Sequence, residues 1–176
     1  MKPLDFDFIK DRFDFELTRK EHLTNALTMP IGVVSAVAGV CAGLARSFSY
    51  PDSWLSWVFV PLFVVNIFAI IACLWNLASA YHLQTYEYLP LLGALAESQE
   101  EFREFASYVK SSDGTLIEHF DEELRGSIIK AADANTRTNE KRVEYLRVGR
   151  LWLFAVLWIT FLAGFSWVAD QLLTIR

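Results

Sequence analysis

The sequence predicts an all-α integral membrane protein with three transmembrane helices, in which spans two and three extend into a cytoplasmic helical hairpin. Three observations lead to this fold class. The 176 residues are 53% hydrophobic and yet 21% charged, a mixture that is unlike a soluble globular domain. The apolar residues are concentrated in runs without formal charge, at 29–45, 53–85 and 151–169. Lys and Arg are concentrated in the segments before the first run and between the second and third.

Residues 1–28 are predicted to form a cytoplasmic amphipathic helix. Its apolar face carries four side chains at helical spacing, Phe6, Ile9, Phe13 and Leu17. The segment holds five Lys or Arg and six Asp or Glu, which fits neither a signal peptide nor the basic polar face of a membrane-surface anchor. We therefore expect it to pack against the protein's own cytoplasmic helices.

A transmembrane hairpin is predicted over 29–81, with spans at 29–48 and 56–81, because about 20 apolar residues cross the hydrocarbon core of a bilayer. Span one is the shorter, and whether it crosses fully is open. It carries Ser35, Gly39 and Gly43 at four-residue intervals, a small-residue pattern that lets membrane helices approach closely. Cys41 lies in the same span without metal-site spacing and is interpreted as a small apolar residue.

Span two carries a seam of small and polar side chains at steps of three and four, formed by Asn66, Ala69, Cys73, Asn76 and Ala80. The amide of Asn66 lies near mid-bilayer and needs a partner. An interhelical hydrogen bond is the favoured interpretation, and the water of a pore is the other. In a symmetric oligomer both can hold, because the seam of each subunit would face the axis.

Residues 82–150 are predicted to form the cytoplasmic hairpin, with a turn at 111–115 in which Gly114 breaks the helix. The second arm then continues from about residue 116 into span three, which with a short tail occupies 151–176. A second seam runs along this arm through Ile128, Ala132, Asn135, Asn139, Arg142 and Leu146. Asn135, Asn139 and Arg142 either fix helix register or oligomer state, which the spacing favours, or bind a small anionic ligand such as a nucleotide.

Basic residues near the membrane predict the orientation. Four of them, Arg137, Lys141, Arg147 and Arg150, come shortly before span three, whereas the loop 49–55 has none. Because Lys and Arg accumulate on the cytoplasmic side, we expect the N-terminus and the hairpin to be cytoplasmic and the C-terminus to lie outside.

Sequence patterns of catalysis and metal binding are missing. The three histidines form no HExxH or Cys/His pattern, and there is no phosphate-binding glycine loop. Residues 82–134 carry four positive and eleven negative side chains, which disfavours general nucleic-acid binding. We expect no enzyme, no cofactor and no metal site.

The whole-chain plan resembles the small multi-pass membrane effectors of bacterial anti-phage defence systems, including nucleotide-signalling, CRISPR-linked and Hailong-type systems. The features that carry the resemblance are TRKEHL before span one, YEYLP after span two and NTRTNEKRVEYL before span three. The resemblance implies a homo-oligomer in the bacterial inner membrane that permeabilises the bilayer, with a regulatory nucleotide or a partner protein as the trigger.

Two functional hypotheses follow. The first is a gated homo-oligomeric pore, or an effector that disrupts the membrane, controlled through the cytoplasmic helices. The alternative is a non-catalytic membrane anchor or adaptor subunit that recruits a soluble partner through the acidic hairpin.

Overall fold

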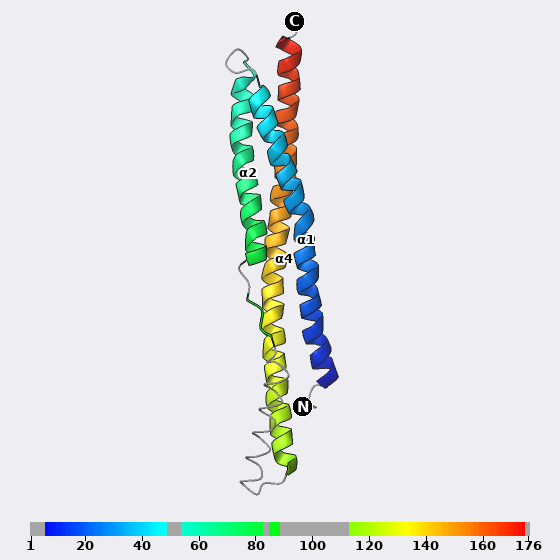
Figure 1. Cartoon of the computed structure of the whole chain (residues 1–176). Coiled ribbons are helices and arrows are strands. Elements are labelled where there is room, and N and C mark those ends of the chain that lie inside the picture. Colours follow the sequence, from blue (N-terminus) through cyan, green and yellow to red (C-terminus); the bar gives the residue numbers. More distant parts are fainter. Residues whose placement is uncertain (1–5, 49–53, 83–84, 89–112, 175–176) are drawn as a thin grey trace. The chain divides into compact units, whose positions relative to one another are not determined.

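The computed structural model describes residues 6–48, 54–82, 85–88 and 113–174. Within these ranges the chain is helical apart from short connecting stretches, and its elements are α1 (Phe6–Ser47), α2 (Ser56–His82) and α4 (Asp113–Thr174) (Figure 1). All three helices are long enough and apolar enough to cross a membrane. The prediction of an all-α protein with three such helices is confirmed.

Helix α1 joins the N-terminal segment and span one in one continuous helix of 42 residues. Pro30 lies inside it. A proline in a helix interior removes one backbone hydrogen bond and costs about 3 kcal/mol in water. Membrane helices tolerate proline because neighbouring helices and local adjustments satisfy the backbone groups that it leaves. The domain boundary expected at residue 28 is therefore no break in secondary structure.

Helix α4 is continuous over 62 residues, so the polar segment before span three and the span itself form one element. The turn expected at 111–115 is wrong in its second half, because α4 begins at Asp113 and includes Gly114. A single glycine costs a helix only about 1 kcal/mol relative to alanine, so Gly114 by itself does not end one. The first arm of the predicted hairpin falls mainly at 89–112 and lies outside the described residues.

The chain divides into two compact units. The first unit comprises Met1–Glu21 and Thr85–Glu140, and the second comprises His22–Gln84 and Lys141–Arg176. Helices α1 and α4 contribute residues to both units, whereas α2 belongs to the second.

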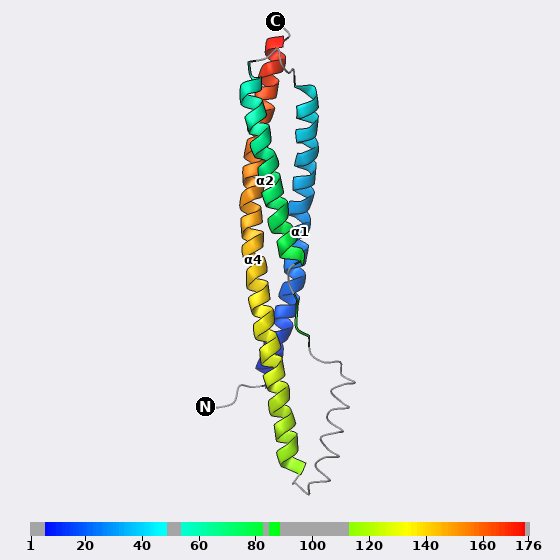
Figure 2. The ribbon, with the colours of Figure 1, turned by 90° about the vertical axis from the view of Figure 1, so that its left-hand side faces the viewer.

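The core of the first unit is formed by α1 and α4, which lie side by side there in both views (Figures 1 and 2). Ile9 and Phe13, from the predicted apolar face, pack against Ile128, Ala131 and Ala132 of α4. The first residues of the predicted α4 seam therefore contact the N-terminal helix, in agreement with the packing expected for residues 1–28.

In the second unit, α1, α2 and α4 pack together through three apolar clusters. One cluster contains Leu27, Val34, Cys73, Leu77, Ala80 and Leu146. The outward surface is apolar too: only 28%, 22% and 17% of the residues in the most apolar windows of the three helices are buried. Large side chains such as Trp57, Phe68, Trp75, Phe154, Trp158 and Phe161 are exposed. An apolar exterior of this extent suits a hydrocarbon surrounding.

Gly149 marks the close approach of α4 to α2. A Cβ added there would lie 3.0 Å from Cδ2 of Leu77 and 3.6 Å from Cβ of Asn76. We expect Gly149→Leu to destabilise the protein by about 1–3 kcal/mol through overpacking, measured as a lower midpoint of thermal unfolding in detergent. Gly149→Ala should have a smaller effect, because the end of the leucine side chain can shift.

Gly32 of α1 is the matched control. It is exposed and a Cβ there meets no atom within 4 Å, so Gly32→Leu should leave the unfolding midpoint nearly unchanged. Equal losses in the two leucine variants would contradict the close contact at Gly149.

Candidate functional site

A polar cluster lies in the apolar interior of the second unit and receives one side chain from each helix. Asn66 of α2 is 1% exposed. Its Nδ2 donates to Sγ of Cys41 in α1 at 3.0 Å and to Oγ1 of Thr160 in α4 at 2.8 Å. The thiol and the hydroxyl also contact each other at 3.5 Å. The interhelical hydrogen bond that the sequence favours for Asn66 is thus formed within one chain.

The amide of Asn66 is only half satisfied. Its Oδ1 is buried and has no hydrogen-bond partner among the residues that the structure describes. Turning the amide by 180° would let Oδ1 accept from the hydroxyl and the thiol, but Nδ2 would then lack an acceptor. A buried amide group without a partner costs about 1–3 kcal/mol in proteins and more where water is excluded. The unpaired oxygen therefore offsets part of the stabilisation that the two hydrogen bonds of Nδ2 give to the packed arrangement.

The rest of the predicted span-two seam also turns inward. Cys73 is fully buried, and its Sγ donates to the backbone oxygen of Gly149 at 3.3 Å. The amide of Asn76 is half-buried and donates to the carbonyl of Ala72 in its own helix at 2.7 Å. The structure thus brings Asn66 and Cys73 to the interface with α1 and α4 of the same chain. A role of this seam at an oligomer axis stays a prediction.

The small-residue stripe of span one, Ser35, Gly39 and Gly43, lies on the exposed side of α1. The hydroxyl of Ser35 bonds the carbonyl of Ile31 in its own helix at 2.9 Å. A Cβ added at either glycine would meet no atom within 4 Å. The structure does not bring this stripe together with the polar cluster, and its predicted use in close helix packing stays a prediction.

Arg142 links the three helices of the second unit. It is 3% exposed, and its Nε donates to the backbone oxygen of Ala80 at 2.9 Å. Its Nη2 donates to Oγ1 of Thr24 in α1, also at 2.9 Å. Ala80 is two residues before the end of α2, where carbonyl groups lack helical donors and the helix dipole is negative. The guanidinium therefore caps α2 with a charge of the favourable sign.

The extended segment Thr85–Tyr88, which we call the strap, is held in the first unit by Asn135. The backbone N–H of Glu87 donates to Oδ1 of Asn135 at 3.0 Å, and Nδ2 of Asn135 donates to the backbone oxygen of Glu87 at 2.9 Å. The amide side chain thus makes the pair of hydrogen bonds that a neighbouring strand would make.

Asn139 joins the strap to α1. It accepts a hydrogen bond from the hydroxyl of Tyr86 at 2.5 Å. Its Nδ2 donates to the backbone oxygen and to Oε2 of Glu16, both at 2.9 Å. Asn135 and Asn139 are both 0% exposed and have used their donors and acceptors within the chain. This geometry is compatible with the register hypothesis; the ligand hypothesis stays a prediction.

Glu16, with 0% of its side chain exposed, is a fully buried acidic residue among the described residues of the first unit. Nη2 of Arg12 lies 2.9 Å from Oε1, close enough for an ion pair although not aligned for a hydrogen bond. Nη1 of Arg19 lies 3.5 Å from Oε2. A carboxylate without water needs such compensation, because a buried unpaired charge is very costly. Glu16 therefore holds Asn139 in place from the α1 side.

Several of these partners have little signal in the sequence. Glu16 looks like one of many solvated acids; the only hint is that it follows Phe13 by three residues, on the apolar face. Cys41 and Thr160 belong to no motif, and only the structure shows that they surround one amide.

The four predicted topology anchors, Arg137, Lys141, Arg147 and Arg150, are exposed. Arg147 pairs with Glu144 at 3.2 Å on the surface of α4. Their exposure leaves them available to solvent or lipid headgroups, and the orientation that they imply stays a prediction.

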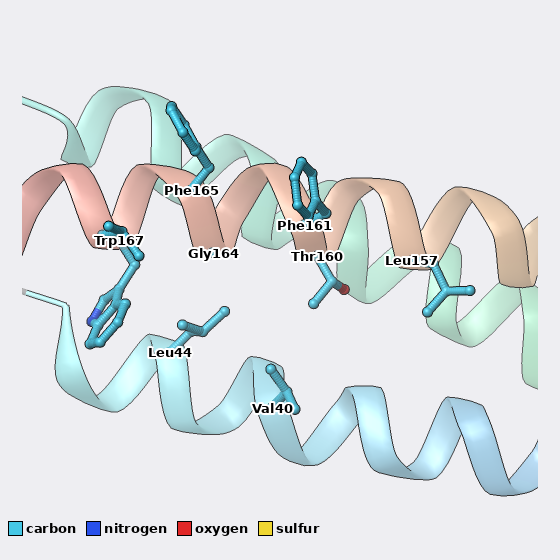
Figure 3. Close-up of a pocket in the computed structure, with 9 residues that line it drawn as sticks. Val40, Leu44, Leu157, Thr160, Phe161, Gly164, Phe165 and Trp167 are labelled. Carbon is cyan, nitrogen blue, oxygen red and sulfur yellow. The ribbon is translucent and has the colours of Figure 1, made fainter.

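An apolar groove of about 540 Å³ lies between α1 and α4 in the second unit. Figure 3 shows Val40 and Leu44 of α1 pointing toward α4, and Leu157 and Thr160 of α4 pointing toward α1. The hydroxyl of Thr160 is engaged with Asn66, so the groove offers apolar surface and little polar recognition. Within the part of the chain that the structure describes, no group of three or more His, Cys, Asp or Glu residues is arranged to hold a metal ion.

Removing the Arg142 side chain tests its place in the second unit. We expect Arg142→Leu to lower the free energy of unfolding by about 2–4 kcal/mol, because the Ala80 carbonyl and the Thr24 hydroxyl lose a charged donor. The measurement is the thermal or denaturant midpoint in detergent. Arg147→Leu on the same helix is the control; its exposed ion pair should contribute less than about 1 kcal/mol. A similar loss in both variants would argue against the cap on α2.

Comparison with known proteins gives no match: no family model matches this sequence, and no curated protein or solved structure matches it.

Proposed function

We propose that this chain is a homo-oligomeric protein of the bacterial inner membrane that forms a gated pore or disrupts the membrane, controlled through its cytoplasmic helices. The observation that carries the proposal is the half-satisfied amide of Asn66 in the interior of the second unit. The architectural resemblance to anti-phage effectors suggests the biological setting.

A passive anchor has no need of such an amide. An apolar side chain of similar size would fill the same space without an unpaired polar atom, and such replacements are often neutral or stabilising. Polar groups at membrane depth are costly and are by default candidates for function. We infer that the described packing is a closed state and that Asn66 meets water when the helices separate.

The closed state is held by contacts that opening would break. Asn66 bonds Cys41 and Thr160, and Cys73 bonds the backbone of Gly149. These contacts join the three helices of the second unit to one another. Their rupture would expose a row of polar and small side chains along α2.

A single chain is too small to enclose an aqueous pore, because side chains from all three helices fill the interior of the second unit. Several copies are therefore needed around a common axis. In the proposed orientation, the basic residues Lys141, Arg147 and Arg150 hold the start of span three on the cytoplasmic side.

The alternative function, a non-catalytic adaptor that recruits a soluble partner, is favoured by a different observation. Asp121, Glu122 and Glu123 are adjacent and exposed in the first unit, together with Asp133. Such a surface would suit a basic partner. An adaptor predicts no change in membrane permeability, which separates it from the pore in the test below.

Asn66→Leu tests the pore. We expect the purified wild-type protein to form oligomers in detergent and to release dye from liposomes. Asn66→Leu should reduce the release about tenfold or more, because water can satisfy the unpaired oxygen of the amide when the helices separate, whereas a leucine gains nothing from water. Ile67→Leu, at the adjacent outward-facing position, is the control and should release dye like the wild type.

Two results count against the pore. A protein that remains monomeric in detergent cannot form it. Equal dye release by wild type and Asn66→Leu would show that the polar cluster has no part in pore opening. If the liposomes release no dye and the protein binds a basic soluble partner, the adaptor is favoured.

A further inference from the structure

We propose that the strap, Thr85–Tyr88, is a releasable latch. In this proposal α1 and α4 of the first unit bind the strap reversibly, and its binding or release determines whether the chain that follows α2 is held. The strap begins three residues after His82, the last residue of α2. Its influence on gating rests on the proposed function, whereas its release does not.

Side chains hold the strap through all the contacts described above. Asn135 bonds the backbone of Glu87, and Asn139 bonds the hydroxyl of Tyr86. The strap residues belong to no helix, and none of these bonds is part of the backbone ladder of α1 or α4. The strap can therefore detach while both helices stay intact, and water can replace each lost bond.

Lys20 recognises the two tyrosines of the strap. Its ammonium group lies 4.7 Å from the ring centroid of Tyr86 and 5.1 Å from that of Tyr88, within the range of cation–π contacts. The same group donates a hydrogen bond to the hydroxyl of Tyr88. Asn135 thus holds the main chain of the strap, while Lys20 and Asn139 recognise its side chains.

The binding surface for the strap exists only when α1 and α4 are packed in the first unit. Lys20 comes from α1, and Asn135 and Asn139 come from α4. Asn139 is held in turn by the buried carboxylate of Glu16 from α1. A rearrangement of the two helices would remove both halves of the surface together. This dependence makes the strap a two-state element that an event at the first unit can bias.

Hydrogen exchange of the full-length protein in detergent tests the latch. In Asn135→Leu we expect the backbone amide of Glu87 to exchange about tenfold faster or more, because its acceptor is gone. The amides of α1 and α4 in the first unit should keep their wild-type protection. Asn25→Leu, which removes an exposed amide from α1, is the control and should leave the strap unchanged.

Tyr86→Phe is a second variant that removes only the hydroxyl bonded to Asn139, with Tyr81→Phe on α2 as its control. It should accelerate exchange in the strap by a smaller factor than Asn135→Leu. Unchanged exchange at Glu87 in both strap variants would overturn the latch. So would a joint loss of protection along α1 and α4, because it would make the contacts purely structural.

Dye release from liposomes then connects the latch to gating. Both strap variants should leak more than the wild type if the latch holds the closed state, and an unchanged leak from a functioning pore would overturn that role. If neither wild type nor variants leak, the pore itself fails, and hydrogen exchange alone still decides whether the strap is released.

Discussion

The constraint on which this structure depends is that a polar side chain without access to water must find its partner inside the chain. Apolar contacts alone leave helix register loosely defined, because neighbouring ridges and grooves offer similar fits. A buried guanidinium defines the register more strongly, because its N–H donors need acceptors at fixed positions. Arg142 satisfies the carbonyl of Ala80 and the hydroxyl of Thr24 at one register of the three helices. Sliding a helix by one turn, about 5.4 Å, would leave a buried charge without its acceptors.

The same constraint acts in the first unit through amides. Asn135 and Asn139 lie four residues apart, so both project from one face of α4. Asn135 bonds the backbone of the strap, and Asn139 bridges Tyr86 and Glu16. A small anionic ligand that used these amides, as the sequence leaves open, would have to displace the strap. It would also have to approach the carboxylate of Glu16. Binding of such a ligand would therefore cost the free energy of the strap contacts and of placing an anion near a carboxylate, and the sequence alone does not reveal this.

The sequence predicts well the three helices that are long enough and apolar enough to cross a membrane, because charge-free runs of this length have few other uses. The period of the seams also identifies Asn66, Asn135, Asn139 and Arg142 as side chains on packed faces, and all four are buried. The sequence does not predict the residues to which these side chains bond. Glu16 and Asn139 are 123 residues apart in the chain, and Thr160 and Asn66 are 94 apart. Such pairs depend on which helices meet and at what height, and one sequence carries no local signal for either.

The two polar sites differ in how completely they are satisfied, and this difference suits a switch. The amides of Asn135 and Asn139 have their donors and acceptors engaged, whereas the amide of Asn66 keeps one atom without a partner in the described chain. A protein with two populated states requires them to lie within a few kcal/mol of each other. In the proposed mechanism the unpaired amide raises the free energy of the closed second unit, and the strap contacts lower that of the closed first unit. In that mechanism a trigger needs to remove only the strap contacts, because the unpaired oxygen of Asn66 already favours opening of the second unit.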